Sequence, residues 1–293
     1  MTGQHPQRCP FCFAENSPGR LVREKTGYRI YRCPTCTVRY VYPQPTPAEL
    51  EAIYSAEYFE RGNKYVLASP GGVDPNRLNE ENKLRHITAI KPRGRLLDVG
   101  CATGGFLAVA HEAGFDVQGV EISGDASART REQFGVDVFT GVLADARFPD
   151  EQFDVVTMWD VIEHVSDPRA HFIEANRILK PGGVLALSTG DIGSLWARVS
   201  GPYWQLLTPP QHLFYFTQPS LESMLKQTGY DRRGVAYSSK VVTLEFLGFK
   251  MREAFGPLIS PIRILTSARM IRNRQVSINL HDIITLLAVK KAG

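Results

Sequence analysis

The sequence lacks any run of about 18 apolar residues, and its first segment, Met1–Pro6, is polar. The first absence excludes a membrane-spanning helix of usual length, and the second argues against a signal peptide. We therefore expect a cytoplasmic protein. Long runs of one charge, internal repeats and low-complexity segments are also missing. The formal net charge of +4 permits nucleic acid as a partner without indicating it.

Cysteine is scarce as well, since the 293 residues contain only five. Four of them form two C-x-x-C pairs, Cys9 with Cys12 and Cys33 with Cys36. In a reducing compartment such pairs indicate metal binding rather than disulfides. Four thiolates complete the tetrahedral shell of a zinc ion and leave no position for a substrate. We predict a structural zinc ribbon over residues 1–42, a unit too small to fold by its own core.

A Pro-rich segment, Tyr42–Pro47, ends this unit. We expect residues 43–79 to form a connecting arm that contains a helix with one apolar side over Ala48–Phe59. Residues 80–293 are long enough for a full α/β domain, and the overall hydrophobic content of 43% is sufficient for its core.

Short apolar runs alternate with segments of helical period through most of this domain. Such alternation predicts a Rossmann-like, mostly parallel α/β sheet with helices on both faces. One crossover helix is expected over Pro168–Leu179, with Asp167 as its N-cap. The seven expected strands are Arg95–Val99, Val117–Glu121, Val136–Gly141, Phe153–Met158, Val184–Ser188, Gly234–Ser238 and Asp282–Lys290.

A loop of small residues, Gly100–Gly105, connects the first of these strands to a helix. A nucleotide-like ligand could approach the backbone of such a loop and the helix N-terminus behind it. Tight packing of the strand against the helix is the alternative explanation for the glycines.

Acidic residues at three successive strands distinguish between possible cofactors. Glu121 follows the loop by about 20 residues, where a carboxylate accepts hydrogen bonds from both ribose hydroxyls. Asp98 would repel a pyrophosphate but attract the α-amino group of a methionine moiety. Asp145 is placed to accept a hydrogen bond from an adenine amino group. The Glu121 position serves both cofactors, and it is Asp98 that favours S-adenosylmethionine over NAD. Each acid alone could cap a loop, but the three together argue against that alternative.

The segments Asp98–Gly104, Val120–Ile122, Ala144–Ala146 and Phe153–Val156 resemble the successive motifs of class I S-adenosylmethionine-dependent methyltransferases. The middle glycine of the usual loop is Ala102 in this chain. The resemblance implies that Cys101 fills space beside the cofactor. The residues implied in cofactor binding are Asp98, Gly100, Ala102, Gly104, Glu121, Ile122, Asp145 and Ala146.

The fourth strand runs into an acidic segment with a histidine, Asp160–His164, at the edge of the sheet where ligands of open α/β folds bind. Methyl transfer is an in-line displacement, and an oxygen or nitrogen acceptor usually loses a proton as it attacks. By its position, His164 is the residue best placed to act as the base.

This segment resembles the Val-Ile-Glu-His stretch of ubiquinone-pathway O-methyltransferases and of small-RNA 2′-O-methyltransferases. In those families an acid three residues ahead of the Glu-His pair helps to bind magnesium or another divalent ion. The resemblance implies a divalent-ion site at Asp160, Glu163 and His164, with His212 as a fourth ligand. Those families usually have Glu where this chain has Asp160. Alternatively, Glu163 caps a turn and His164 packs against the cofactor.

The segment Thr208–Thr217 resembles the His-x-Phe-Tyr-Phe stretch that follows strand five in many small-molecule and sugar methyltransferases. The resemblance implies that it lines the acceptor pocket. We therefore expect a catalytic group of Glu163, His164 and His212. Nearby aromatic residues would supply walls for a ring-shaped substrate, or else form a lid packed on the sheet: Trp196, Tyr203 and Trp204.

Residues 241–275 are both apolar and basic, which predicts a helical insertion. It could lie on a membrane surface near a lipid-linked substrate, act as a lid, form a dimer contact, or pack on the sheet between the last two strands.

The resemblances, including that of the ribbon to those before methyltransferase domains of polysaccharide and natural-product pathways, imply a methyltransferase that acts on a small molecule or sugar of such a pathway. The acceptor would be an oxygen, nitrogen or carbon atom. One alternative is an rRNA methyltransferase whose ribbon binds RNA. Another is a non-catalytic scaffold whose ribbon binds a partner, although the complete set of cofactor motifs argues against it. The basic residues available to the ribbon are Arg8, Arg20, Arg23, Lys25, Arg29, Arg32 and Arg39.

Overall fold

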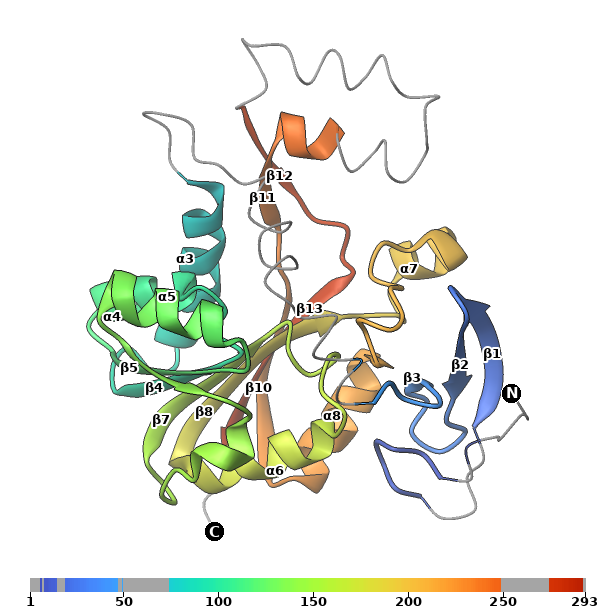
Figure 1. Ribbon diagram of the computed structural model, residues 1–293, viewed down its shortest axis with the longest axis horizontal. Helices are drawn as coiled ribbons and strands as arrows, with labels where there is room; N and C mark the ends of the chain where they lie inside the picture. Colours follow the sequence, from blue (N-terminus) through green and yellow to red (C-terminus); the bar gives the residue numbers. More distant parts are fainter. Residues whose placement is uncertain are drawn as a thin grey trace.

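A seven-stranded sheet forms the centre of the computed structural model (Figure 1). The structure describes residues 6, 8–14, 19–46, 49, 74–248 and 274–291. The strands lie in the order β10, β13, β8, β7, β4, β5, β6. Their bounds are β4 (Arg95–Val99), β5 (Asp116–Glu121), β6 (Asp137–Thr140), β7 (Phe153–Trp159), β8 (Leu179–Gly190), β10 (Tyr230–Tyr237) and β13 (Ile283–Lys290).

The five strands from β8 to β6 run parallel to one another. Strand β13 is antiparallel to both of its neighbours, β8 and β10. All seven expected strands are present, so the predicted Rossmann-like, mostly parallel sheet is confirmed. Strands β4, β7 and β8 are buried over most of their length, because helices cover both faces of the sheet.

Alternate residues of the strands face two separate cores, one on each side of the sheet. Leu96 of β4 contacts the core that α3 and α4 cover, and its neighbour Leu97 contacts the core that α6 and α8 cover. Figure 1 shows the two sets of helices on opposite sides of the sheet. Helix bounds are α3 (Pro75–Thr88), α4 (Gly105–Glu112), α5 (Gly124–Phe134), α6 (Pro168–Ile178) and α8 (Gln218–Gln227).

The expected N-terminal capping of helix α6 is confirmed. The Asp167 carboxylate accepts a hydrogen bond from the Ala170 amide at 2.9 Å, and Pro168 occupies the first turn. This N-cap satisfies an amide that the helix itself leaves unpaired.

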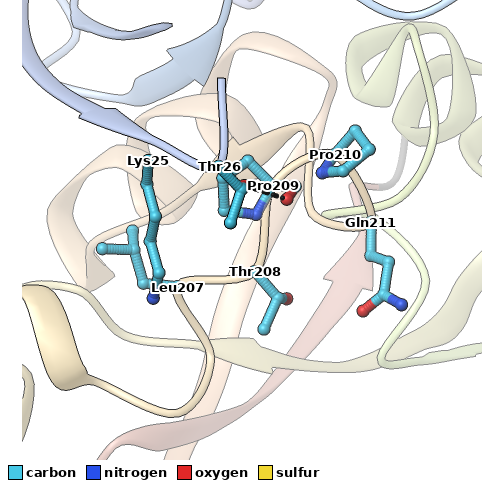
Figure 2. A pocket seen from close by; sticks show the side chains of 7 residues that line it. All are labelled: Lys25, Thr26, Leu207, Thr208, Pro209, Pro210 and Gln211. Atoms are coloured by element: carbon cyan, nitrogen blue, oxygen red, sulfur yellow. Dashed lines mark hydrogen bonds between the residues drawn. The ribbon is translucent and has the colours of Figure 1, made fainter. Parts of the chain in front are cut away.

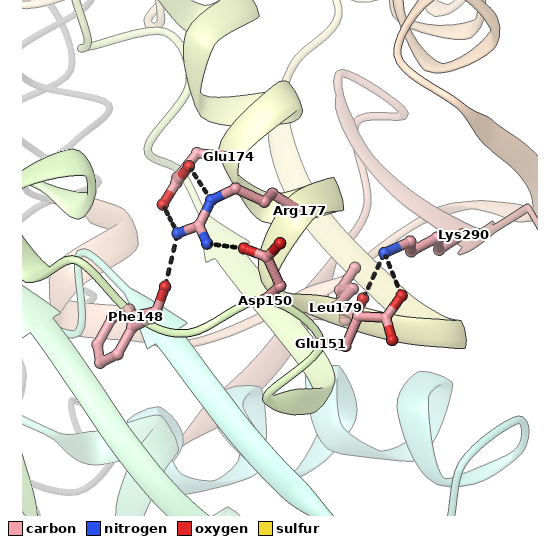
Figure 3. Close-up of polar contacts among 7 residues, drawn as sticks. All are labelled: Phe148, Asp150, Glu151, Glu174, Arg177, Leu179 and Lys290. Atoms are coloured by element: carbon pink, nitrogen blue, oxygen red, sulfur yellow. Dashed lines mark hydrogen bonds and ion pairs between the residues drawn. The ribbon is translucent and has the colours of Figure 1, made fainter. Parts of the chain in front are cut away.

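Ion pairs and hydrogen bonds connect chain segments at the edge of the sheet opposite the glycine loop (Figure 3). Arg177 of α6 donates hydrogen bonds to Glu174 at 2.9 Å and to the Phe148 carbonyl at 2.7 Å. Lys290 of β13 donates to the Leu179 carbonyl at 2.7 Å and lies 3.6 Å from Glu151. These contacts fix the loop that precedes β7.

The N-terminal strands form a second sheet with a strand from the larger domain. We call this the ribbon sheet: β1 (Arg20–Lys25), β2 (Tyr28–Arg32), β3 (Arg39–Val41) and β9 (Phe214–Tyr215), in that order. Tyr40 lies opposite Phe214, and the Val41 amide donates to the Leu213 carbonyl at 2.8 Å. Phe11 also packs against Phe214, with ring centroids 6.3 Å apart. The ribbon sheet therefore continues past the expected boundary at residue 42.

The ends of the expected insertion differ from the prediction. Instead of helix, β11 (Lys240–Thr243) pairs antiparallel with β12 (Gln275–Ile278), and the helical part of the described residues in this region is 244–248. Cross-strand pairing of β-branched residues, such as Val242 with Val276, favours a ribbon here. Residues 249–273 and the expected helix Ala48–Phe59, except Glu49, lie outside the described residues. Among the helices that are described, none is long and apolar enough to cross a membrane.

Candidate active site

The four paired cysteines come together as the sequence predicts. The Sγ atoms of Cys9 and Cys36 are 3.7 Å apart, and so are those of Cys12 and Cys33. Zinc–sulfur bonds of about 2.3 Å in a tetrahedron place the sulfur atoms about 3.8 Å apart. All four are free thiols rather than disulfides. The donor set and its dimensions therefore fit a structural zinc ion.

The glycine loop leaves β4 with three residues in the left-handed region. The φ angles of Gly100, Ala102 and Gly104 are 72°, 49° and 79°. A Cβ atom at Gly100 would lie 2.6 Å from a methyl group of Val161, so this position has no room for a side chain. Ala102 adopts a conformation that costs an L-residue energy, which is unusual enough to indicate a functional constraint.

Glu121, at the end of β5, holds this loop in place. One carboxylate oxygen accepts a hydrogen bond from the Ala102 amide at 2.9 Å, and the other accepts from the Ser123 amide at 2.8 Å. The side chain is buried. Each carboxylate oxygen can accept a second hydrogen bond, so the group can hold the loop and a ligand hydroxyl together.

Asp98 is buried one residue before the end of β4. Burial raises the pKa of its carboxyl to about 7, against the opposing effects of a hydrogen bond from Thr157 and the charge of Lys83. The Thr157 hydroxyl donates to Asp98 at 2.6 Å. A cationic ligand group beside Asp98 would favour its ionised form.

Helix α3 adds charged residues to this edge that the sequence reasoning missed. Lys83 forms an ion pair with Glu80 at 3.0 Å and lies 5.5 Å from the centre of the Trp159 ring. The indole Nε1 of Trp159 is buried without a hydrogen-bond partner among the described residues. A buried donor of this kind needs an acceptor, which a ligand in the site could supply. No motif marks α3; only the fold brings it to the site.

The other residues that were expected to bind the cofactor follow strands β5 and β6 at the same edge of the sheet. The Gly141 amide donates to the Glu121 carbonyl at 2.9 Å, which joins the ends of β5 and β6. Ile122 is 60% exposed, unusual for a large apolar side chain at the end of a core strand. Asp145 is exposed and Ala146 half-buried, both in the short helix Leu143–Ala146.

Glu163, His164 and His212 meet beside β7. Their ligand atoms all lie within 4.8 Å of one another. The two imidazole rings are edge to face with centroids 4.6 Å apart, and His164 Nδ1 lies 2.8 Å from the Gln211 carbonyl oxygen. The Leu213 amide donates to the Glu163 carbonyl at 2.7 Å, which attaches the His212 segment to the end of β7.

Burial controls the charge of this group. It raises the pKa of Glu163 to about 8, with a further contribution from Asp160, and it lowers the pKa of His212 to about 3. It also lowers the pKa of His164. One Glu163 oxygen is buried without a hydrogen-bond partner among the described residues. The group thus offers neutral imidazoles and a carboxyl, with Glu163 buried and both histidines half-buried.

Asp160 is not part of this group. Its carboxylate accepts a hydrogen bond from the Ser188 hydroxyl at 2.8 Å, and its φ of 54° is left-handed. Burial opposes ionisation, but the charges of Lys240 and Lys83 leave the pKa of Asp160 below its usual value. Two imidazoles and one carboxylate also suit zinc, manganese or iron better than magnesium, which prefers oxygen ligands.

The expected aromatic wall is wrong in part. Trp204 is buried, and its indole donates to the Asp282 carboxylate at 2.8 Å, so it belongs to the core. Tyr203 is 82% exposed on the surface. Trp204 packs in one cluster with Ile30 and Val41 of the ribbon sheet, a contact that the sequence pattern did not reveal.

Comparison with known proteins agrees with this geometry. A family profile described as a methyltransferase domain matches residues 74–233, more than half of the chain. The chain is 30% identical over 162 residues to a ubiquinone biosynthesis O-methyltransferase of Cereibacter sphaeroides, covering 49% of this chain and 64% of the relative. It is 34% identical over 107 residues to a 2-methyl-6-phytyl-1,4-hydroquinone methyltransferase of Synechocystis, covering 35% of this chain and 34% of the relative.

Among solved structures, the magnesium protoporphyrin IX methyltransferase of Synechocystis with bound SAH superposes with a TM-score of 0.57. That match has 14% identity and covers 84% of this chain and 100% of that one. An identity this low shows the fold alone. With the sheet order, the glycine loop and the family match together, the chain belongs to the methyltransferase domain family and has the class I, Rossmann-like fold.

Proposed function

We propose that this protein is an S-adenosylmethionine-dependent methyltransferase that acts on a small molecule. The observation that carries the proposal is the position of two groups at one edge of the sheet. Asp98 and Glu121 lie beside the glycine loop, and the Glu163, His164 and His212 group lies at the end of the next strand, β7. A cofactor site and an acceptor site are thereby adjacent, as direct methyl transfer requires.

The cofactor-side residues fit the polar parts of adenosylmethionine. Asp98 would attract its α-amino group, Glu121 would accept hydrogen bonds from its ribose, and Asp145 would accept one from its adenine. Exposed Ile122 would pack on the adenine ring. Bound adenosylmethionine supplies a methyl group on a cationic sulfur.

On the acceptor side, the residues orient the acceptor and remove its proton. His164 is the proposed base, because the Gln211 carbonyl oxygen only accepts hydrogen bonds and so keeps the ring hydrogen of neutral His164 on Nδ1. Its Nε2 is then unprotonated. A metal ion held by Glu163, His164 and His212 is the alternative way to activate the acceptor.

The names of the relatives support a small-molecule acceptor, since they refer to ubiquinone, a hydroquinone and a protoporphyrin. We extend this to a sugar or natural-product acceptor with an oxygen, nitrogen or carbon nucleophile. The free cysteines support a reducing, cytoplasmic location. A membrane contact through residues 241–275 would involve mainly the part of the chain outside the described residues.

Calorimetric titration of the zinc-loaded full chain with adenosylmethionine tests the proposal. We expect saturable binding, weakened about tenfold to a hundredfold by Glu121→Gln, because a buried charged acceptor is lost. Glu132→Gln, on the exposed face of α5, is the matched control and should bind normally. Absence of binding to the wild-type protein would disprove the cofactor assignment. A screen of small acceptors for S-adenosylhomocysteine formation then tests the reaction.

A further inference from the structure

One face of the ribbon sheet carries a cluster of cationic residues. In the strand register, Arg20 lies opposite Arg32, and Arg32 lies opposite Arg39. Arg23 lies opposite Ile30, which is two residues from Arg32 and so points to the same side. We call this the basic face; its charged members are Arg20, Arg23, Lys25, Arg32 and Arg39.

The described residues supply no counter-ion to the arginines of the basic face. None of the four has an ion pair or a hydrogen bond to another side chain within the part of the chain that the structure describes. Like charges placed directly opposite one another destabilise a sheet. Burial, with the charges of Arg32 and Arg23, lowers the pKa of Arg39. Among the described residues nothing offsets this repulsion, whereas a bound anion would.

The same face leads to the acceptor group. Arg39 lies opposite Tyr215 of β9 in the register, so their side chains are neighbours on one side of the sheet. The Tyr215 ring centroid is 6.2 Å from that of His212. The Tyr215 hydroxyl is buried without a hydrogen-bond partner among the described residues, which leaves it available to a ligand.

A cavity of about 360 Å³ opens between the β1–β2 turn and the segment that precedes His212 (Figure 2). Lys25 and Thr26 line it from the ribbon, and residues 207–211 line it from the larger domain. Lys25 donates to the Pro202 carbonyl at 3.0 Å, and Thr26 donates to the Pro209 carbonyl at 3.0 Å. Gln211, at the other end, contacts His164 through its carbonyl oxygen.

We propose that this cavity and the adjoining basic face bind an anionic group of the methyl acceptor, a phosphate or a carboxylate. The proposal rests on the proposed function, because it takes the histidine group as the acceptor site. Anchoring the anion on the ribbon would hold the acceptor atom near His164 and would explain why the ribbon shares a sheet with β9. Arginine and lysine are the usual partners of such oxyanions.

Anion titrations of the zinc-loaded full chain test the proposal. Inorganic pyrophosphate and succinate, titrated separately at constant ionic strength, distinguish a phosphate from a carboxylate ligand. We expect saturable binding of one of them, weakened at least tenfold by the Lys25→Gln and Arg39→Gln double variant. Arg29→Gln is the matched control, because Arg29 lies on β2 but faces the other side, opposite Glu24. Binding that is absent, or equally weak in the control, overturns the proposal.

Two further measurements separate the remaining explanations. Arg32→Gln should raise the melting temperature of the anion-free protein, because it removes a like-charge pair; a lower melting temperature would mean that Arg32 is structurally paired and would overturn the proposal. Binding of single-stranded RNA far tighter than pyrophosphate, and lost in the same double variant, would replace the small anion by nucleic acid. Loss of adenosylmethionine binding with intact pyrophosphate binding would instead overturn the proposed function.

Discussion

His164 and His212 meet edge to face, with ring centroids 4.6 Å apart and an interplanar angle of 86°. The contact joins two segments that are far apart in the sequence, the end of β7 and the loop before β9. The Gln211 carbonyl oxygen, 2.8 Å from His164 Nδ1, orients the first ring. The two histidines thus form one unit on the proposed acceptor side of the site.

His164→Ala should reduce turnover about a hundredfold or more, because it removes the proposed base. Adenosylmethionine affinity should stay unchanged, since the ring does not belong to the cofactor edge. His212→Ala should also reduce turnover. Steady-state rates of S-adenosylhomocysteine formation and calorimetric titration measure the two properties. His111→Ala, on the exposed side of α4, is the control. Full activity of both variants would make these histidines packing residues.

Chelation distinguishes a proton-transfer base from a metal site. If Glu163, His164 and His212 hold a metal ion, EDTA should abolish turnover, and manganese or zinc should restore it better than magnesium. Elemental analysis must show that the ribbon has kept its zinc, because its loss would also inactivate the enzyme. Activity that survives EDTA unchanged would favour His164 as a metal-independent base.

Adenosylmethionine affinity should fall as the pH drops below about 7, the raised pKa of Asp98 in the free protein. The cationic amino group of the ligand favours the ionised carboxylate, so binding releases a proton in this range. Calorimetric titrations at pH 6 and pH 8, each about one unit from that pKa, measure the affinity. Repeating them in buffers of different ionisation enthalpy measures the proton release. Asp98→Asn should remove the pH dependence and weaken binding; a wild-type affinity independent of pH would contradict the role of Asp98.

The same titration has the opposite effect on the stability of the cofactor-free protein, which falls as the pH rises. The native pKa of Asp98 lies above the ordinary value of 3.8, so the native state binds this proton more tightly than the unfolded state. Asp98 therefore lowers the stability of the cofactor-free protein as the pH rises from about 4 to about 7. Asp98→Asn should raise the melting temperature at pH 8 in the absence of cofactor.

Cys33→Ser should lose about one zinc ion per chain, because four thiolates complete the site. Adenosylmethionine binding should largely survive, because the four expected zinc ligands lie outside the glycine loop and outside the strands that carry Asp98 and Glu121. Turnover should fall, because β3 would no longer support β9 and the His212 segment. Elemental analysis and the two assays above check this, with Cys101→Ser as the control that retains zinc. A reduced protein without zinc would disprove the ribbon.

Local sequence was enough to predict the large sheet and the position of Asp98 and Glu121 at one of its edges. Strand and helix periods, together with caps such as Asp167, depend on neighbouring residues. Carboxyl ends of adjacent parallel strands meet at one edge, so Asp98 and Glu121 could be placed together without coordinates. The spacing of the two C-x-x-C pairs likewise predicted that the four cysteines lie close together.

Only the tertiary structure decided how the ribbon joins the larger domain. A two-residue strand such as Phe214–Tyr215 is too short to show an alternating apolar pattern, so its pairing with β3 could not be predicted from the sequence. The burial of Trp204 could not be predicted for the same reason. Lys83 reaches the site because α3 packs against α4 and β11. Asp160 reaches Ser188 from a left-handed backbone. Contacts of this kind depend on packing between distant segments, whose partners no local pattern specifies.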